Sequence, residues 1–122
     1  MAALGWKLDV LDRAALLDRF PPTWPDVIAD HVTFGGSAAD GGLPPQVSAQ
    51  IVGQADDGVG LQALVVAIDG TTGRPDGSIY HITWSLDRAA GRRPVESNDL
   101  LATADWKLVT PVPIHLTPAR LG

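Results

Sequence analysis

The stretch "YHITWSL" (residues 80–86) decides the fold predicted for this chain. It is rich in β-branched and aromatic residues, which favour strands, and its apolar and polar residues alternate. Side chains along a strand point alternately to opposite faces. The apolar face has Ile82, Trp84 and Leu86, and the polar face has His81, Thr83 and Ser85. The sequence therefore predicts a strand with one face in the core and with an imidazole and hydroxyls on the other.

An earlier stretch, "DHVTFGG" (residues 30–36), has the same arrangement. Val32 and Phe34 are predicted to face the core, which leaves His31 and Thr33 on the opposite face of the strand. The chain has three histidines, and two of them precede an apolar residue and a threonine in these matched strands.

Working outward, hydrophobic alternation predicts further strands, and two segments have helical signals. Residues 11–20 are predicted to form a helix that buries Val10, Ala14, Leu17 and Phe20, and Ser97 is predicted to cap a second helix over residues 97–104. The predicted strands are residues 4–10, 27–34, 46–54, 61–68, 79–86 and 107–117. Pro111 and Pro113 place the last strand at a sheet edge. The predicted class is α+β, mostly antiparallel, with two short helices.

Length and composition restrict the kind of protein. A chain of 122 residues fits one domain over residues 1–122, large enough to fold around its own core. It has no cysteine, which excludes disulfides and thiolate metal sites. Its net charge of −5 argues against binding along duplex DNA. With no long apolar run and no signal-peptide pattern, we expect a cytoplasmic protein with no membrane contact.

The paired His-x-Thr pattern suggests acid–base chemistry on a phosphate. Imidazoles titrate near neutral pH, so one can accept a proton while the other donates one. Hydroxyls from Thr33 and Thr83 would donate hydrogen bonds to phosphate oxygens. These groups suit attack of water on a phosphodiester and departure of an alcohol, with no cofactor and no metal.

The two motifs and their flanks resemble a known family. "PDVIADHVTFG" and "YHITWSLDRAAGRRPVESNDLL" are similar to the tandem H-x-T segments of the two-histidine (2H) phosphoesterase superfamily, over residues 20–101. The nearest likeness is to compact domains associated with RNA repair and fungal-type tRNA ligases. The resemblance implies a bilobal fold with His31 and His81 as catalytic residues and with Thr33 and Thr83 on the phosphate. It implies metal-independent hydrolysis of a 2′,3′-cyclic phosphate on an RNA 3′ end or nucleotide, or of a related cyclic or 2′-5′ linkage.

Other residues are weaker candidates for the site. Substrate contacts are considered for Ser85, Tyr80, Trp24, Arg92 and Arg93. His115 and Thr117 form a third H-x-T, but His115 lies between prolines near the chain end, so His81 is the predicted partner of His31. Ser97 and Asn98 are predicted to cap a helix, and their place in the family-like stretch leaves a role in the site open. The glycine-rich segments "GGLPPQ" and "DGTTGRPDG" are predicted to be turns, because neither has the context of a phosphate-binding loop.

Two other functions fit the same residues. One is a binding module for an RNA end or cyclic nucleotide that has the fold but no activity. The other is a metal site formed by the three histidines, although the paired hydroxyls would then be unexplained. The sequence does not identify protein partners.

Overall fold

The computed structural model describes residues 4–35, 42–103 and 106–121, and it contains two antiparallel sheets and two α-helices. The smaller sheet has the strand order β3-β1-β8, and the larger has the order β2-β6-β5-β4-β7. The strands are β1 (Leu4–Leu8), β2 (Asp26–Val27), β3 (His31–Gly35), β4 (Ala49–Asp56), β5 (Leu61–Ile68), β6 (His81–Leu86), β7 (Lys107–Ile114) and β8 (Leu116–Arg120). The helices are α1 (Val10–Arg19) and α2 (Ser97–Thr103), with short 3₁₀ turns η1 (Arg88–Ala90) and η2 (Pro94–Glu96).

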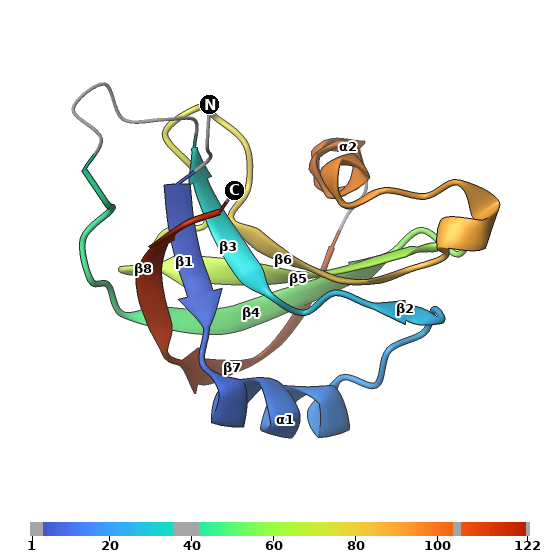
Figure 1. The fold of residues 1–122 in the computed structure, drawn as a ribbon, viewed down its shortest axis with the longest axis horizontal. Coiled ribbons are helices and arrows are strands. Elements are labelled where there is room, and N and C mark those ends of the chain that lie inside the picture. Colours follow the sequence, from blue (N-terminus) through green and yellow to red (C-terminus); the bar gives the residue numbers. More distant parts are fainter. Residues whose placement is uncertain (1–3, 36–41, 104–105, 122) are drawn as a thin grey trace.

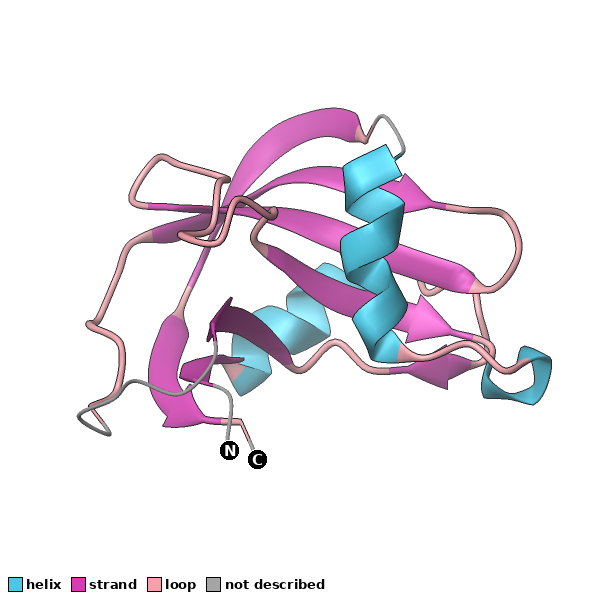
Figure 2. Ribbon diagram, turned by 90° about the horizontal axis from the view of Figure 1, so that it is seen from above, coloured by secondary structure: helices cyan, strands magenta, loops and turns pink. Residues whose placement is uncertain are grey.

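The larger sheet is covered on both faces. In Figure 1, β1, β3 and β8 cross in front of β4, β5 and β6, and Trp6, Leu64 and Trp84 belong to the core on this side. Figure 2 shows a helix lying across the other face, where α2 contacts β4 and β5. Leu100 and Leu101 of α2 pack there on Ala63, Val65 and Leu86. Because both faces of β5 are covered, every residue of that strand is buried.

The predicted α+β class with antiparallel sheets and two helices is confirmed. The strand predicted over residues 61–68 has those bounds as β5, and the proline-containing β7 lies at a sheet edge as predicted. The strand predicted over residues 107–117 instead divides into β7 and β8, which belong to different sheets. Residues 36–41, which include the first glycine of the predicted turn "GGLPPQ", lie outside the described residues. No described helix is long and apolar enough to cross a membrane.

The single strand predicted over residues 27–34 is wrong, because the chain changes sheets at Ile28–Asp30. Ile28 N–H donates to the Trp84 carbonyl at 2.9 Å and Ala29 N–H to the Thr83 carbonyl at 3.0 Å. Ala29 then turns the chain with φ 45°, in the left-handed region that L-residues rarely adopt. The Asp30 carbonyl accepts from Leu8 N–H of β1 at 3.0 Å. This crossing places the start of β3 next to β6.

The buried face of α1 also differs from the prediction. Val10 is 78% exposed, and Ala14 is exposed, whereas Leu16 is buried. Leu17 and Phe20 do pack on the core as expected. Arg13 reaches inward, and its Nε donates to the Ala29 carbonyl at 2.8 Å. The helix is therefore rotated relative to the predicted face, and its Arg13 side chain supports the crossing between the sheets.

A bulge in β6 inverts the predicted faces of its last two residues. Thr83 pairs with Ala63 and Ser85 with the adjacent Gln62, so Trp84 is the extra residue. His81 and Thr83 share a face as expected, and this face is the one that α2 covers. Ser85 turns to the opposite side, where it hydrogen-bonds to Gln62. Leu86 moves to the α2 side, where it packs on Leu100. The simple alternation that predicted Ser85 beside Thr83 is therefore wrong beyond the bulge.

Candidate functional site

The two His-x-Thr motifs line one pocket of about 240 Å³. β3 and β6 supply the four residues of the motifs, and the loop between β5 and β6, η2 and α2 supply the rest. The lining residues are His31, Thr33, Arg74, His81, Thr83, Pro94, Val95 and Asn98. No carboxylate is among these described lining residues, although the chain as a whole has a net charge of −5.

His81 is a buried imidazole held in one tautomer. Its Nδ1–H donates to the Ile79 carbonyl at 2.8 Å, so Nε2 carries the lone pair when the ring is neutral. Burial lowers the pKa of His81, and the positive charges of the nearby Arg74 and His31 lower it further. The hydrogen bond to the Ile79 carbonyl acts in the opposite direction, but the net effect is a lowered pKa. His81 is therefore neutral at pH 7 and suited to accept a proton.

His31 has a different partner, the carboxylate of the residue before it. Its Nδ1 lies 3.0 Å from Asp30 Oδ2, which also accepts a hydrogen bond from Lys7 Nζ. Burial opposes ionisation of Asp30, but the hydrogen bonds from Lys7 and His31 outweigh it and lower the pKa of Asp30. An ionised carboxylate accepts only, so Nδ1 of His31 carries a proton and Nε2 is left to exchange one. Such a carboxylate holds the imidazole ring of His31 in one orientation.

The two threonines of the motifs are not equivalent. Thr83 Oγ1 donates to the Pro94 carbonyl at 3.2 Å and lies 2.8 Å from Ser97 Oγ, which is fully buried. The hydroxyl proton of Thr83 is therefore donated within the protein and not to a ligand. The hydroxyl of Thr33 makes no hydrogen bond with the described residues, so it is free to donate to a bound group. The structure ties Thr83 to the segment that contains η2 and α2.

Arg74 is a pocket residue that the sequence analysis missed, since its segment was interpreted only as a turn. Arg74 begins a tight turn in which Gly77 N–H donates to its carbonyl at 2.9 Å, with Gly77 at φ 90°. Its Nη2 donates to Asp76 Oδ2 at 3.0 Å, and the side chain is only 9% exposed. The proline and glycine of "RPDG" predict this turn, but no sequence pattern predicts that it brings a guanidinium to the histidines.

The third histidine is not in this pocket. His115 lies between β7 and β8, where its Nδ1 is 2.9 Å from Asp12 Oδ2 and its side chain is 84% exposed. It lines a separate cavity of about 420 Å³ beside β4 and β7. The three histidines therefore do not converge, and the described residues contain no group of three or more His, Cys, Asp or Glu side chains that could hold a metal ion.

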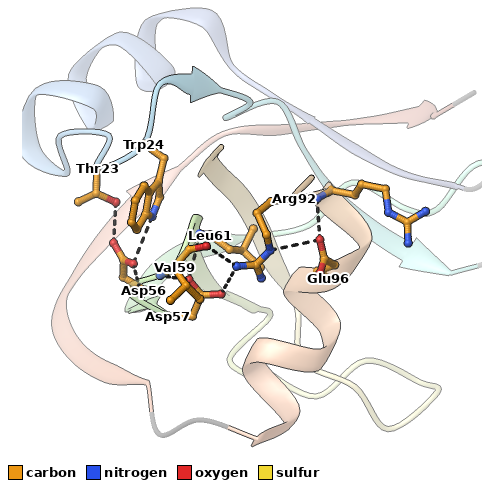
Figure 3. Close-up of polar contacts among 10 residues, drawn as sticks. Thr23, Trp24, Asp56, Asp57, Val59, Leu61, Arg92 and Glu96 are labelled. Carbon is orange, nitrogen blue, oxygen red and sulfur yellow. Dashed lines mark hydrogen bonds and ion pairs between the residues drawn. The ribbon is translucent and has the colours of Figure 1, made fainter. Parts of the chain in front are cut away.

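Ser85, Tyr80 and Trp24, which were considered as substrate contacts, lie outside the pocket. Ser85 is fully buried and its hydroxyl donates to Gln62 Oε1 at 2.6 Å. Tyr80 is buried against Trp6, with an edge-to-face ring contact at 6.0 Å. Trp24 Nε1 donates to Asp56 Oδ1 at 3.2 Å, which holds the proline loop (residues 21–25, "PPTWP") on β4 (Figure 3).

The two arginine candidates are also placed elsewhere. Arg92 Nη1 lies 2.7 Å from Asp57 Oδ2, and its Nε lies 3.3 Å from Glu96 Oε1 (Figure 3). Arg92 thus links η2 to the turn between β4 and β5. Arg93 is exposed, and neither arginine lines the pocket. Ser97 does not cap α2 as predicted: it is the first helical residue, with φ −59° and ψ −31°, and its hydroxyl contacts Thr83.

Comparisons with models of protein families, with curated proteins and with solved structures gave no match for this chain. The likeness to 2H phosphoesterases therefore depends on the two H-x-T segments themselves. What the structure adds is the position of both motifs around one pocket.

The contacts of the threonines predict different effects of their removal. If the pocket acts on a phosphate as the H-x-T pattern predicts, Thr33→Ala should slow turnover about 10- to 100-fold, since a hydrogen bond to a charged group contributes about 1.5–3 kcal/mol, without lowering the melting temperature. Thr83→Ala should instead lower the free energy of unfolding by about 1–3 kcal/mol, because it leaves the buried Ser97 hydroxyl without its partner. Urea unfolding and steady-state kinetics measure both, with Thr83→Ser as the matched control that retains the hydroxyl. Equal stability losses in the two alanine variants would contradict this division of roles.

Proposed function

We propose that this chain is a metal-independent phosphodiesterase of the 2H type, which hydrolyses a 2′,3′-cyclic phosphate on an RNA 3′ end or a nucleotide. The observation that carries the proposal is that His31, His81 and Thr33 line the same pocket, beside the guanidinium of Arg74. The two sheets that supply the motifs are compatible with the bilobal architecture that the resemblance implies.

The two histidine environments suggest separate roles. Burial favours the neutral ring of His81, so its Nε2 can accept a proton. That proton comes from a water molecule whose oxygen attacks phosphorus. Nε2 of His31 donates a proton to the ribose oxygen as its bond to phosphorus breaks. The products are a phosphomonoester and a vicinal hydroxyl, and proton exchange with solvent restores both rings. Thr33 binds a non-bridging phosphate oxygen.

A substrate panel tests this proposal. The panel contains 2′,3′-cyclic mononucleotides, RNA oligomers ending in a cyclic phosphate, and 2′-5′ dinucleotides, with the product position determined by NMR. We expect hydrolysis of at least the first class at neutral pH. If none of the three classes is hydrolysed, the proposal is wrong.

A binding module is the second candidate, and one observation favours it. The hydroxyl of Thr83 donates to Pro94, which departs from the phosphate-binding role that the H-x-T pattern implies. A non-catalytic protein would bind the same ligands saturably but release them unchanged. Turnover in the panel therefore distinguishes the two functions.

The rate should depend on pH in a bell-shaped manner, since one ring must be neutral and the other protonated. Burial places the pKa of His81 below the usual value of about 6.5, so kcat/KM should be retained at pH 6.5 and fall at lower pH. The rate should also fall at higher pH, and the two apparent pKa values belong to the pair of groups. A profile of kcat/KM against pH checks this, and a rate that rises steadily with pH to about 10 would contradict it.

A further inference from the structure

The pocket contains a buried cation with an unused hydrogen-bond donor. Nε of Arg74 is buried and has no partner among the described residues, while Nη2 is held by Asp76. The side chain is only 9% exposed, so water does not surround the guanidinium. A buried donor without a partner is destabilising, and such groups in native proteins are uncommon. A bound anionic oxygen would satisfy it.

Asn98, in the same pocket, has a buried hydrogen-bond acceptor without a partner among the described residues, whereas Arg74 has a buried donor. Its Nδ2 donates to the Val95 carbonyl at 3.2 Å, which assigns the orientation of the amide. Oδ1 is then buried and accepts no hydrogen bond from the described residues. A ligand that satisfies both residues therefore has an anionic acceptor for Arg74 and a hydroxyl donor for Asn98.

The size of the pocket restricts how much of a nucleotide it can hold. Its volume of about 240 Å³ is below the roughly 300–1,000 Å³ typical of pockets that enclose a whole drug-sized ligand. The described lining residues have two imidazoles, a guanidinium and an amide, and none of them is a Phe, Tyr or Trp on which a base could stack. A phosphate with its ribose suits this lining, and the nucleobase would lie outside it.

We propose that Arg74 binds a non-bridging phosphate oxygen and that Asn98 Oδ1 accepts a hydrogen bond from the neighbouring ribose hydroxyl, with the nucleobase outside the pocket. This rests on the proposed function, since the phosphate and the vicinal hydroxyl are those of its product. It predicts recognition of the sugar-phosphate with little discrimination among bases.

Binding of three probes tests the assignment without turnover. Adenosine 2′-monophosphate, adenosine 3′-monophosphate and inorganic phosphate are titrated into ¹⁵N-labelled protein, and the imidazole signals of His31 and His81 report binding. Arg74→Gln should weaken binding of all three about 10- to 100-fold, the loss expected for a charge-assisted hydrogen bond. Asn98→Ala should weaken binding of the nucleotides several-fold but not of inorganic phosphate. Uridine monophosphates should bind within a few-fold of the adenosine ones.

Controls separate binding from folding. Arg88→Gln makes the same change of charge at an exposed position outside the pocket, and it should bind like the wild type. Arg74→Lys retains the charge and should bind better than Arg74→Gln. Arg74→Gln should unfold at nearly the same temperature as the wild type, because loss of the ion pair with the exposed Asp76 is offset by removal of a buried donor that has no partner among the described residues.

The failures are distinguishable. Arg74→Gln binding as tightly as the wild type, or a wild type with no saturable shift for any probe, would overturn the assignment of Arg74. If Asn98→Ala weakens the binding of inorganic phosphate as much as that of the nucleotides, the assignment of Asn98 to the ribose hydroxyl is overturned. Arg74-dependent binding in a protein that hydrolyses no member of the substrate panel would instead contradict the proposed function while supporting the anion site.

Discussion

Replacement of either pocket histidine by alanine is expected to lower turnover of a 2′,3′-cyclic nucleotide by about 100-fold or more, the usual contribution of a positioned acid or base. Both rings have Nδ1 bonded, His31 to Asp30 and His81 to Ile79, so each is oriented and presents Nε2 for proton transfer. Steady-state kinetics of His31→Ala and His81→Ala measure the effect.

The double variant and His115 provide the controls. His31→Ala combined with His81→Ala should lose much less than the product of the single losses, because the two groups act as one unit. His115→Ala should stay within a few-fold of the parent, since this ring is exposed beside Asp12 and outside the pocket. An inactive His115→Ala with an active His81→Ala would show that the pairing is wrong.

The largest expected effect on stability is that of Trp84→Ala. Trp84 is fully buried at the bulge of β6, and its Nε1 donates to the Phe20 carbonyl at 2.7 Å. Truncation of a buried tryptophan to alanine costs about 3–5 kcal/mol, a large part of the roughly 5–15 kcal/mol that stabilises a typical domain. Urea unfolding of the wild type and the variant measures this loss.

Trp24→Ala is the matched control, because Trp24 is half-buried in the proline loop and donates to the exposed side chain of Asp56. Its loss of stability should be clearly smaller than that of Trp84→Ala. A similar loss in both variants, or less than about 1 kcal/mol for Trp84→Ala, would contradict the role of Trp84 as the centre of the core between the sheets.

Much of the fold could be predicted from local patterns. Hydrophobic runs predicted β5, and alternation predicted that His31 and Thr33, like His81 and Thr83, share a face of a strand. These properties depend on the period of side chains along a single strand, which the sequence contains directly.

The remaining features depend on interactions between distant segments. Nothing in the local pattern predicts that the chain changes sheets at Ile28–Asp30, because Ala29 is in the left-handed region that glycine or asparagine normally adopts. The bulge at Trp84 reverses the face of Ser85, and only the pairing with Gln62 shows it. Arg74 was missed because a turn sequence predicts its own backbone and not the pocket to which its side chain is directed.

The same limit explains the candidates that lie elsewhere. Arg92 has the charge expected of a phosphate ligand, but Asp57 and Glu96 bind it. Glu96 lies only four residues after Arg92, but Asp57 comes from a distant part of the chain, so the ion pair with Asp57 was not visible in the sequence. Arg74 is the arginine that the fold brings to the histidines.

The most direct test of a metal-independent site built from His31 and His81 is the hydrolysis of a 2′,3′-cyclic mononucleotide after extensive treatment of the protein with EDTA. The wild type should retain its full rate in chelator, and the double variant His31→Ala, His81→Ala should not exceed the small residual rate of either single variant. Loss of the wild-type rate in EDTA with recovery on addition of a divalent ion, or a double variant as active as the wild type, would contradict the account.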